Sequence, residues 1–315
     1  MGWQQIPARS VSMNPADMEL CMTKIPLLTM LFVVSIPIAC CEAQSLGYSR
    51  NRIAMSFDGN SAPDHDYKWP TGDPDDWGAL PASCAIIAKL GLQKQLVHCS
   101  YNNFIDSPPG PDAENQLKIS ADGVIKYWGF DRDVFFDVTI EQRQAVENLA
   151  AEMAKSTDRD PLYFIHAGLS EFLYLAVKEV VRNEKVDSLA HVYLVSHSAF
   201  NENECRRKSH HTWNDVQQLS GDRIKYTKIK DQNDKEDPNH LWHSGKNFAV
   251  WHWMRDHPEP DVRWMYSRLK AHRGQVADIS DCGMLFYLLV GDADGSPVKF
   301  RDFIGNRIVS KNHSE

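Results

Sequence analysis

Two groups of carboxylates, close together in the sequence, are the residues whose types and spacing could do chemistry. Asp58-Gly59-Asn60 directly follows the apolar run at 52–57, and Asp73-Pro74-Asp75-Asp76 precedes a stretch with helical spacing of apolar residues. Carboxylate oxygens are the hard ligands that calcium prefers. Without a cation, acids this close would raise one another's pKa. The alternative is a loop that only caps a helix, since Asp is a favoured N-cap residue; the residues alone leave both interpretations open.

An alternation of strands and helices would position these acids. Short apolar runs predict strands at 52–57, 95–100, 161–166, 189–196 and 223–229. Apolar residues at helical spacing predict helices at 77–90, 139–155, 169–182, 210–219, 248–256 and 280–290. The order predicts a three-layer, Rossmann-like α/β fold, with helices on both faces of a mainly parallel sheet, in a single domain over 48–315. Ligands of such sheets bind at the carboxyl ends of the strands. Asp58, the long loop at 101–122, His166 and Ser196 fall at such ends.

The amino-terminal residues are typical of a targeting segment. Lys24 precedes an apolar stretch at 25–41, which is shorter than the roughly 20 residues that a membrane span needs. We expect a signal peptide at 1–43 with cleavage near Ala43. Residues 1–21 are interpreted as the result of a start site assigned too early, with Met22 as the true first residue. A lipid anchor at Cys40 is the alternative. The sequence therefore predicts an exported protein, periplasmic or extracellular, without a membrane span.

Charge and composition limit the partners. The 34 Lys and Arg against 42 Asp and Glu give a net charge of −8, which disfavours nucleic acid as a partner because phosphate contacts need clustered cations. Hydrophobic residues make up 43% and charged residues 24%, as is usual for a globular protein. The sequence does not decide whether the cysteines form disulfides or remain free thiols, or whether the protein forms a homo-oligomer. The cysteines beyond residue 43, none with C-x-x-C spacing, are Cys84, Cys99, Cys205 and Cys282.

The order of the motifs resembles the nucleoside hydrolase superfamily, and its divergent exported branch more than its inosine-uridine enzymes. In that family the first strand ends in an Asp, followed by Asp-Asp at a helix start, as in Asp58 and Asp75-Asp76. Asp281, which opens a late apolar helix, resembles the family's last metal aspartate. The resemblance covers nearly the whole mature chain in the right order. Three further segments carry it, HAGLSEF at 166–172, SHSAFN at 196–201 and TWND at 212–215.

The resemblance implies a calcium-dependent glycosidase that hydrolyses a nucleoside N-ribosyl bond or a related glycosidic bond. Asp58 would be the general base and a calcium ligand. Asp76, Asp281 and the backbone carbonyl near His166 would complete the calcium shell, and Asp75 would bind sugar hydroxyls. The substrate would be a small nucleoside or glycoside. The other substrate-binding candidates are Asn60, Glu171, Asn201 and Asn214.

Three departures from the family pattern bear on turnover. Residues 59–74 lengthen the segment between the acids and form a candidate specificity loop. Ser280 stands where the inosine-uridine enzymes carry a His as leaving-group acid, and Ser56 stands where many relatives have another Asp. His197, at a strand end, would replace the missing acid, since His titrates near neutrality. The alternative function is a non-catalytic carbohydrate-binding protein that retains the calcium–diol site.

Aromatic residues late in the chain have two interpretations. Trp242, Trp251, Trp253 and Trp264 either pack as a cap over the sheet or form an aromatic wall over a sugar or base. The turn Asp231-Gln232-Asn233 follows a predicted strand and would reach the same edge of the sheet as Asp58.

Overall fold

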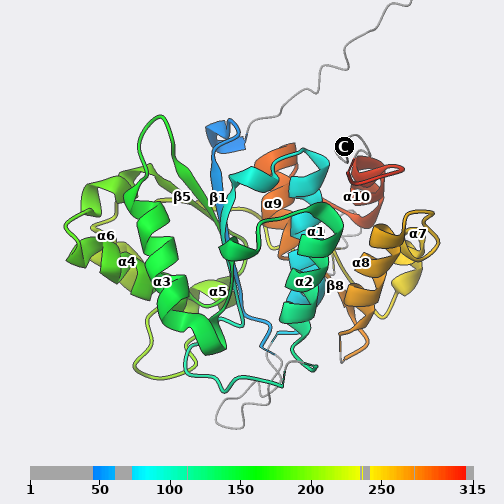
Figure 1. Ribbon diagram of the computed structural model, residues 1–315, viewed down its shortest axis with the longest axis horizontal. Coiled ribbons are helices and arrows are strands. Elements are labelled where there is room, and N and C mark those ends of the chain that lie inside the picture. The colour runs from blue at the N-terminus through cyan, green and yellow to red at the C-terminus, as the bar shows by residue number, and fades with distance from the viewer. Residues whose placement is uncertain are drawn as a thin grey trace, which may run out of the picture. The chain divides into compact units, whose positions relative to one another are not determined.

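A computed structural model describes residues 45–60, 73–111, 113–234, 236, 242–272 and 274–309 (Figure 1). The expected signal peptide at 1–43 lies outside the described residues, and so does most of the specificity loop expected at 59–74. All described residues belong to one compact unit. Within these ranges, no helix has the length and apolar character needed to cross a membrane.

Six parallel strands form the central sheet, in the order β3-β2-β1-β4-β5-β6. The inner strands are buried on both faces, which explains their nearly continuous apolar sequences. In this doubly wound order the direction of winding reverses between β1 and β4, and a crevice for a ligand forms at the carboxyl ends of that pair. The strands are β1 (Arg52–Phe57), β2 (Leu96–Tyr101), β3 (Phe135–Asp137), β4 (Leu162–Ala167), β5 (Val192–Ser196) and β6 (Lys225–Lys228).

Helices cover both faces of the sheet, which confirms the expected three-layer α/β fold (Figure 1). One layer, at the left of Figure 1, contains α3 (Val138–Ala154), α4 (Ser170–Arg182) and α6 (Trp213–Ser220). The other layer contains α1 (Asp76–Lys89), α2 (Gln116–Trp128), α8 (Pro260–Lys270) and α9 (Cys282–Val290). Each layer encloses its own cluster of buried apolar side chains against the sheet.

Short elements complete the described part of the chain. A two-stranded antiparallel ribbon pairs β7 (His243–Gly245) with β8 (Ala277–Asp278) just before α9. Cys84, Cys99, Cys205 and Cys282 are all free thiols. The short helices are α5 (Ala199–Asn203), α7 (His252–Arg255) and α10 (Pro297–Ile304), and the 3-10 segments are Ser45–Gly47, Gln93–Gln95, Arg132–Val134, Val186–His191 and Phe248–Trp251.

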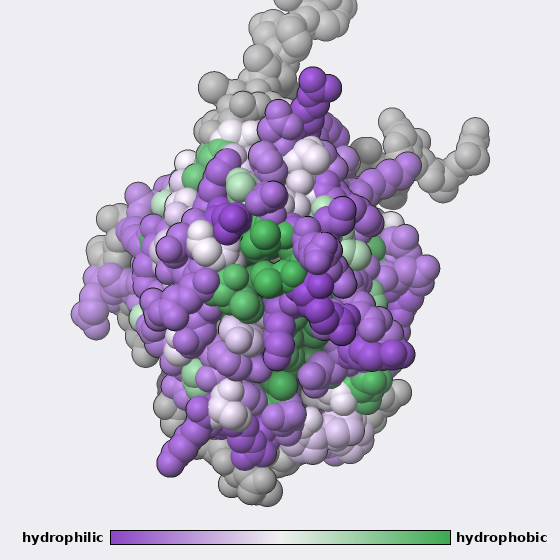
Figure 2. Space-filling view, turned by 90° about the vertical axis from the view of Figure 1, so that its left-hand side faces the viewer, coloured by the Kyte–Doolittle hydropathy of each residue, from purple (hydrophilic) through white to green (hydrophobic). Residues whose placement is uncertain are grey.

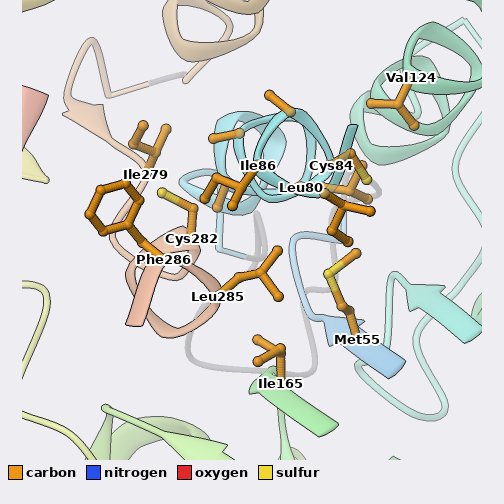
Figure 3. Close-up of a cluster of buried hydrophobic side chains, with 14 of the residues drawn as sticks. Met55, Leu80, Cys84, Ile86, Val124, Ile165, Ile279, Cys282, Leu285 and Phe286 are labelled. Atoms are coloured by element: carbon orange, nitrogen blue, oxygen red, sulfur yellow. The ribbon is translucent and has the colours of Figure 1, made fainter. Parts of the chain in front are cut away.

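A dense apolar core fixes the positions of α1 and α9 relative to the sheet. Figure 3 shows Leu80 of α1, Leu285 of α9, Met55 of β1 and Ile165 of β4 directed toward one another. All four side chains are fully buried. Burial of each such side chain stabilises the fold by roughly 1.5–3 kcal/mol. The packing therefore holds the amino-terminal ends of these two helices, where Asp76 and Asp281 lie, in a defined place.

Some expected element boundaries are wrong for local reasons. The strand expected at 189–196 begins only at Val192, because the preceding residues form a 3-10 segment. The loop expected at 101–122 ends early, because Asn115 caps α2 by accepting a hydrogen bond from the Lys118 amide at 3.0 Å. The helix expected at 248–256 is a 3-10 segment followed by the short α7. The sequence also gave no expectation of β3, α5, α8 or α10.

The face that carries α3, α4 and α6 shows a group of apolar side chains surrounded by hydrophilic ones (Figure 2). A cavity of about 370 Å³ lies between α3 and α4, lined by Val146 and Leu175 together with the charged Arg143, Lys178 and Glu179. Among the described residues, the one carboxylate cluster that could hold a metal ion lies instead at the carboxyl ends of the strands, which is therefore the better candidate for a functional site.

Candidate functional site

The acids come together where β1, α1 and α9 meet. Asp58 follows the last residue of β1, Asp75 and Asp76 stand at the start of α1, and Asp281 directly precedes α9. Gly59 allows the chain after β1 to approach α1 closely, since a Cβ at this position would lie 2.6 Å from the Asp73 carbonyl oxygen and 2.8 Å from Asp76 Cβ. The Trp77 indole fixes the same turn by donating to the Gly59 carbonyl at 2.7 Å.

Three carboxylates lie close enough to share one cation. Asp75, Asp76 and Asp281 each offer a carboxylate oxygen, and these atoms lie within 4.8 Å of one another. Asp58 joins them through its backbone, because its amide donates to Asp76 Oδ2 at 2.6 Å. Asp58, Asp75, Asp76 and Asp281 are all less than one-tenth exposed. The structure thus assembles four acids from distant parts of the sequence in one buried place.

Two buried oxygens in this cluster have no hydrogen-bond partner, namely Asp58 Oδ2 and Asp76 Oδ1. Buried polar atoms of this kind are rare, because leaving them without a partner costs free energy. Among the described residues, no Lys or Arg forms an ion pair with Asp58, Asp75, Asp76 or Asp281. The donor set, hard oxygens with unsatisfied lone pairs, therefore fits a divalent cation such as calcium.

The electrostatics of the cluster agree with this. Burial raises the pKa of Asp58 well above its usual range, and the charges of Asp73 and Asp281 raise it further. The pKa of Asp76 is raised in the same way, by burial and then by Asp281, Asp58 and Asp73. Burial and Asp73 raise the pKa of Asp75. Without a cation the fold resists full ionisation of these acids, whereas a bound cation would favour the ionised form.

Helix capping explains only part of this arrangement. Asp75 is the N-cap of α1 and its Oδ1 accepts from the Asp76 amide at 2.9 Å, as a purely structural loop would require. Asp281 occupies the N-cap position of α9 but makes no capping hydrogen bond from its side chain. Since the amino-terminal ends of both helices carry partial positive charge, they partly offset the negative charge of the cluster. The carboxylate of Asp281 is therefore directed to another partner.

That partner is His197, which follows β5. His197 Nε2 lies 2.7 Å from Asp281 Oδ1, and Nδ1 lies 3.4 Å from Asp231 Oδ1 and 3.2 Å from the Gln232 amide nitrogen. Burial lowers the pKa of His197, but the hydrogen bonds and charges of Asp231 and Asp281 outweigh this effect and raise it to about 9. The two carboxylates therefore favour the protonated form of His197, at the edge of the acidic cluster.

A cavity of about 440 Å³ opens beside the acids. A volume of this order suits a small-molecule ligand. Polar groups and aromatic rings share its walls, so the acids meet a pocket that could hold both a hydroxylated and an apolar group. Its lining includes Asp73, Asp75, Phe104, His197, Phe200, Asn201, Asn233 and Asp281.

Asn60, a predicted substrate-binding residue, is buried and is not among the residues that line this cavity. Its Oδ1 accepts from the Phe104 amide at 3.1 Å, and its Nδ2 has no partner. Ser56, two residues before Asp58, accepts from Asn103 Nδ2 at 2.6 Å and from Ser100 Oγ at 2.8 Å. A neutral hydroxyl at position 56 thus binds two neighbouring polar side chains, where a further acid would add to the charge of the cluster.

Asn201 and His166 are brought together at the ends of β4 and β5. Asn201 lines the cavity, and its Nδ2 donates to the His166 carbonyl at 3.1 Å. The carbonyl that we expected to bind calcium thus already accepts one hydrogen bond. The His166 ring lies near Ser170 Oγ and the Asn201 carbonyl, each at 3.1 Å from Nε2. His166 therefore connects β4 to α5, and its ring is not among the groups that line the cavity.

Two further predicted substrate-binding residues also do not line the cavity. Glu171 is buried at the start of α4, and its Oε2 accepts from the His211 amide at 2.6 Å and contacts His211 Nδ1 at 2.8 Å. It holds the loop before α6. Asn214 is exposed on α6 and is not among the cavity-lining residues. Both expectations came from matching short segments, which does not show which way a side chain points.

Of the two interpretations of the late tryptophans, the aromatic wall does not describe this cavity, because no Trp lines it. Trp242 and Trp251 are fully buried and stack on each other with ring centroids 6.3 Å apart, so they pack in the core. Phe104 and Phe200 line the cavity instead. Phe104 lies in the long loop after β2, which the sequence did place at the correct edge of the sheet. Asn233 also lines the cavity, as the position of its turn after a strand indicated.

Comparison with known proteins gives no functional label. No protein-family model matches the chain, and no solved structure matches it. A protein of Formosa agariphila, described as uncharacterized protein P22, is 25% identical over 262 residues, which span 78% of this chain and 86% of that protein. This similarity spans most of both chains without establishing a family, so the argument for function must come from the site.

Proposed function

We propose that this protein is an exported, calcium-dependent glycosidase of the nucleoside hydrolase type, acting on an N-ribosyl or related glycosidic bond. The carrying observation is the convergence of Asp75, Asp76 and Asp281 within 4.8 Å beside a cavity of about 440 Å³. The winding order of the sheet supports the proposal, because a reversal between β1 and β4 is where such folds bind ligands.

Asp75, Asp76 and Asp281 would hold the cation, with Asp58 next to them. When bound, calcium would lower the pKa of a coordinated water and orient sugar hydroxyls. Asp58 Oδ2 has no hydrogen-bond partner in the protein, so it is free to accept a proton from the attacking water. The hydroxyl group of the water would form a bond to the anomeric carbon as the glycosidic bond breaks. The remaining proton of the water would end on the leaving group.

The walls of the cavity would position the substrate. Asn201 and Asn233 offer amide groups for sugar hydroxyls, and the rings of Phe104 and Phe200 offer apolar surface for a flat or apolar leaving group. The His197 cation would stabilise negative charge on the leaving group or donate a proton to it. Holding these groups in fixed relative positions lowers the entropic cost of the reaction.

A second candidate function, carbohydrate binding without turnover, is favoured by the contacts of His197. Both of its ring nitrogens are already engaged, Nε2 with Asp281 and Nδ1 with Asp231 and the Gln232 amide. A proton held between two carboxylates is less available to a leaving group. Ser280, at the position of the family's acid, donates to Asn233 Oδ1 at 3.0 Å and has no proton to spare near neutral pH.

Two measurements on the same preparation separate these functions. Isothermal calorimetry should show one calcium bound per chain in the wild type and none in Asp76→Asn. Release of reducing sugar from a panel of nucleosides and glycosides should then occur with calcium and stop with a chelator. Asp122→Asn, on the exposed face of α2, is the matched control and should behave as the wild type.

Each outcome decides between the candidates. Calcium binding with turnover supports the glycosidase, and calcium-dependent sugar binding without turnover supports the carbohydrate-binding protein. A wild type that binds no calcium, or an Asp76→Asn variant that binds it equally well, would reject both.

A further inference from the structure

A second and larger cavity, of about 1010 Å³, lies at the opposite edge of the sheet. Its lining includes Arg50, two residues before β1, and Gln95, directly before β2. The cavity therefore lies where these strands begin. The carboxyl-terminal ends of α1 and α2 contribute Lys89 and Trp128. In Figure 1, β1 begins at the upper edge of the sheet and ends at the lower edge. The cavity thus lies beyond the start of β1, and Asp58 directly follows its end.

The charge of this cavity is opposite to that of the acidic site. Arg50, Lys89, Lys94 and Arg307 line it, and none of its described lining residues is acidic. The chain as a whole carries a net charge of −8, so four cations around one cavity depart from its overall balance. Such an arrangement attracts anions.

The contacts of these cations show which are available to a ligand. Lys89 is occupied, because Nζ donates to the carbonyls of Ile304 at 2.8 Å and of Arg307 at 2.7 Å. Arg307 Nε is buried and has no hydrogen-bond partner, while its Nη2 lies 3.4 Å from Glu259 Oε1. Within the described part of the chain, Arg50 and Lys94 form no ion pair.

A purely structural explanation covers Lys89 fully and Arg307 only in part, through the contact of its Nη2 with Glu259. Cations often lie at the carboxyl-terminal ends of helices, where they offset the partial negative charge of the last carbonyls. Lys89 does this at the end of α10. Arg307 Nε donates to no carbonyl, and a buried donor without an acceptor needs another explanation. An oxyanion in the cavity would supply the acceptor.

The remaining walls are apolar, with Leu90, Trp128, Ile308 and Val309 among them. We propose that this cavity binds an amphiphilic organic anion, its phosphate, sulfate or carboxylate group held by Arg307, Arg50 and Lys94 and its apolar body against Ile308 and Val309. The site is separate from the acidic cluster, and neither proposal depends on the other.

Calorimetry on the full chain tests the proposal, with octyl phosphate, inorganic phosphate and octanol as probes. Octyl phosphate should bind one-to-one, inorganic phosphate more weakly, and octanol without saturation. Octyl sulfate and octanoate, run in the same way, should rank the three anionic head groups. Calcium should leave these affinities unchanged, since the acids lie at the other edge.

Variants decide whether binding occurs at this cavity. Arg307→Gln should weaken octyl phosphate binding by about tenfold to a hundredfold, the range for a lost charge-assisted hydrogen bond. Lys94→Gln should weaken it less, since Lys94 is exposed and solvent screens its charge. Arg143→Gln is the control, because Arg143 is 81% exposed on α3. Absence of octyl phosphate binding by the folded wild type, or equal binding by Arg307→Gln and Arg143→Gln, would overturn the proposal.

Discussion

Replacing Asp76 by Asn should change stability in opposite directions with and without calcium. Asn has nearly the same size, and its side-chain oxygen can still accept from the Asp58 amide, which now contacts Asp76 Oδ2 at 2.6 Å. The substitution removes a buried negative charge that faces Asp281, Asp58 and Asp73. Without calcium, the charge of Asp76 lowers the free energy of unfolding. With calcium, the same carboxylate is a ligand and stabilises the fold.

The magnitude follows from the pKa of Asp76, which burial and neighbouring acids raise well above its usual range. A carboxyl whose pKa is raised in the folded state stabilises the fold when protonated and loses that stability as the pH rises. Each unit of raised pKa costs about 1.4 kcal/mol at neutral pH. Relief of about 1–2 kcal/mol should raise the melting temperature of the calcium-free variant by roughly 2–8 °C.

Calcium should reverse this order. At a calcium concentration of about 100 times Kd, the wild type gains about 2.7 kcal/mol, whereas a variant that binds none gains nothing. Differential scanning calorimetry at pH 7, with chelator and with excess calcium, measures all four melting temperatures. If calcium-free Asp76→Asn melts below the wild type, the buried charge of Asp76 does not destabilise the fold. If calcium raises the melting temperatures of both proteins equally, the cluster is not the calcium site.

Three further outcomes are expected. Asp58→Asn should lower turnover by about 10²–10⁴-fold while the Kd for calcium changes little, and full activity in this variant would exclude Asp58 as the base. His98, whose pKa burial lowers to about 4, gains a proton on unfolding when the pH lies between about 4 and 6.5. Wild type should therefore lose up to about 3 kcal/mol relative to His98→Gln as the pH falls through this window, measured by urea unfolding; a constant difference would contradict this. Gly168→Ala should lower the free energy of unfolding by about 1–3 kcal/mol, because a Cβ there would lie 2.3 Å from Asn103 Nδ2; unchanged urea unfolding would show that Asn103 can move away.

The layered fold could be predicted because each central strand is a short apolar run bounded by turn residues. β1 and β4 begin and end within one residue of their expected positions. β3 could not be predicted in this way, since three residues carry no periodicity and its pairing with β2 decides its conformation. α2 was missed because its amino-terminal signal is a single asparagine in a Pro-rich segment.

The acidic cluster was accessible from the sequence for a related reason. A residue just after a buried parallel strand must lie at the carboxyl edge of the sheet, whichever way its side chain turns. This places Asp58, and the same rule holds for the loop that contains Phe104. Side-chain direction was not accessible, so Asn214 was expected in the site although it is exposed on α6.

The contacts between side chains from distant segments could not be predicted from the sequence either. Nothing in the local pattern shows that His197 would lie between Asp231 and Asp281, because these three residues come from separate segments. The same holds for Arg307, which joins Lys89 and Arg50 around the larger cavity only through the packing of α10 against α1. Contacts of this kind depend on the tertiary fold.

The most direct test of the central claim is a crystal structure of the protein grown with calcium, with the ion located by its anomalous scattering. We expect one peak, bound by carboxylate oxygens of Asp75, Asp76 and Asp281. A map without a peak there at saturating calcium, or with calcium bound only at other residues, would contradict it.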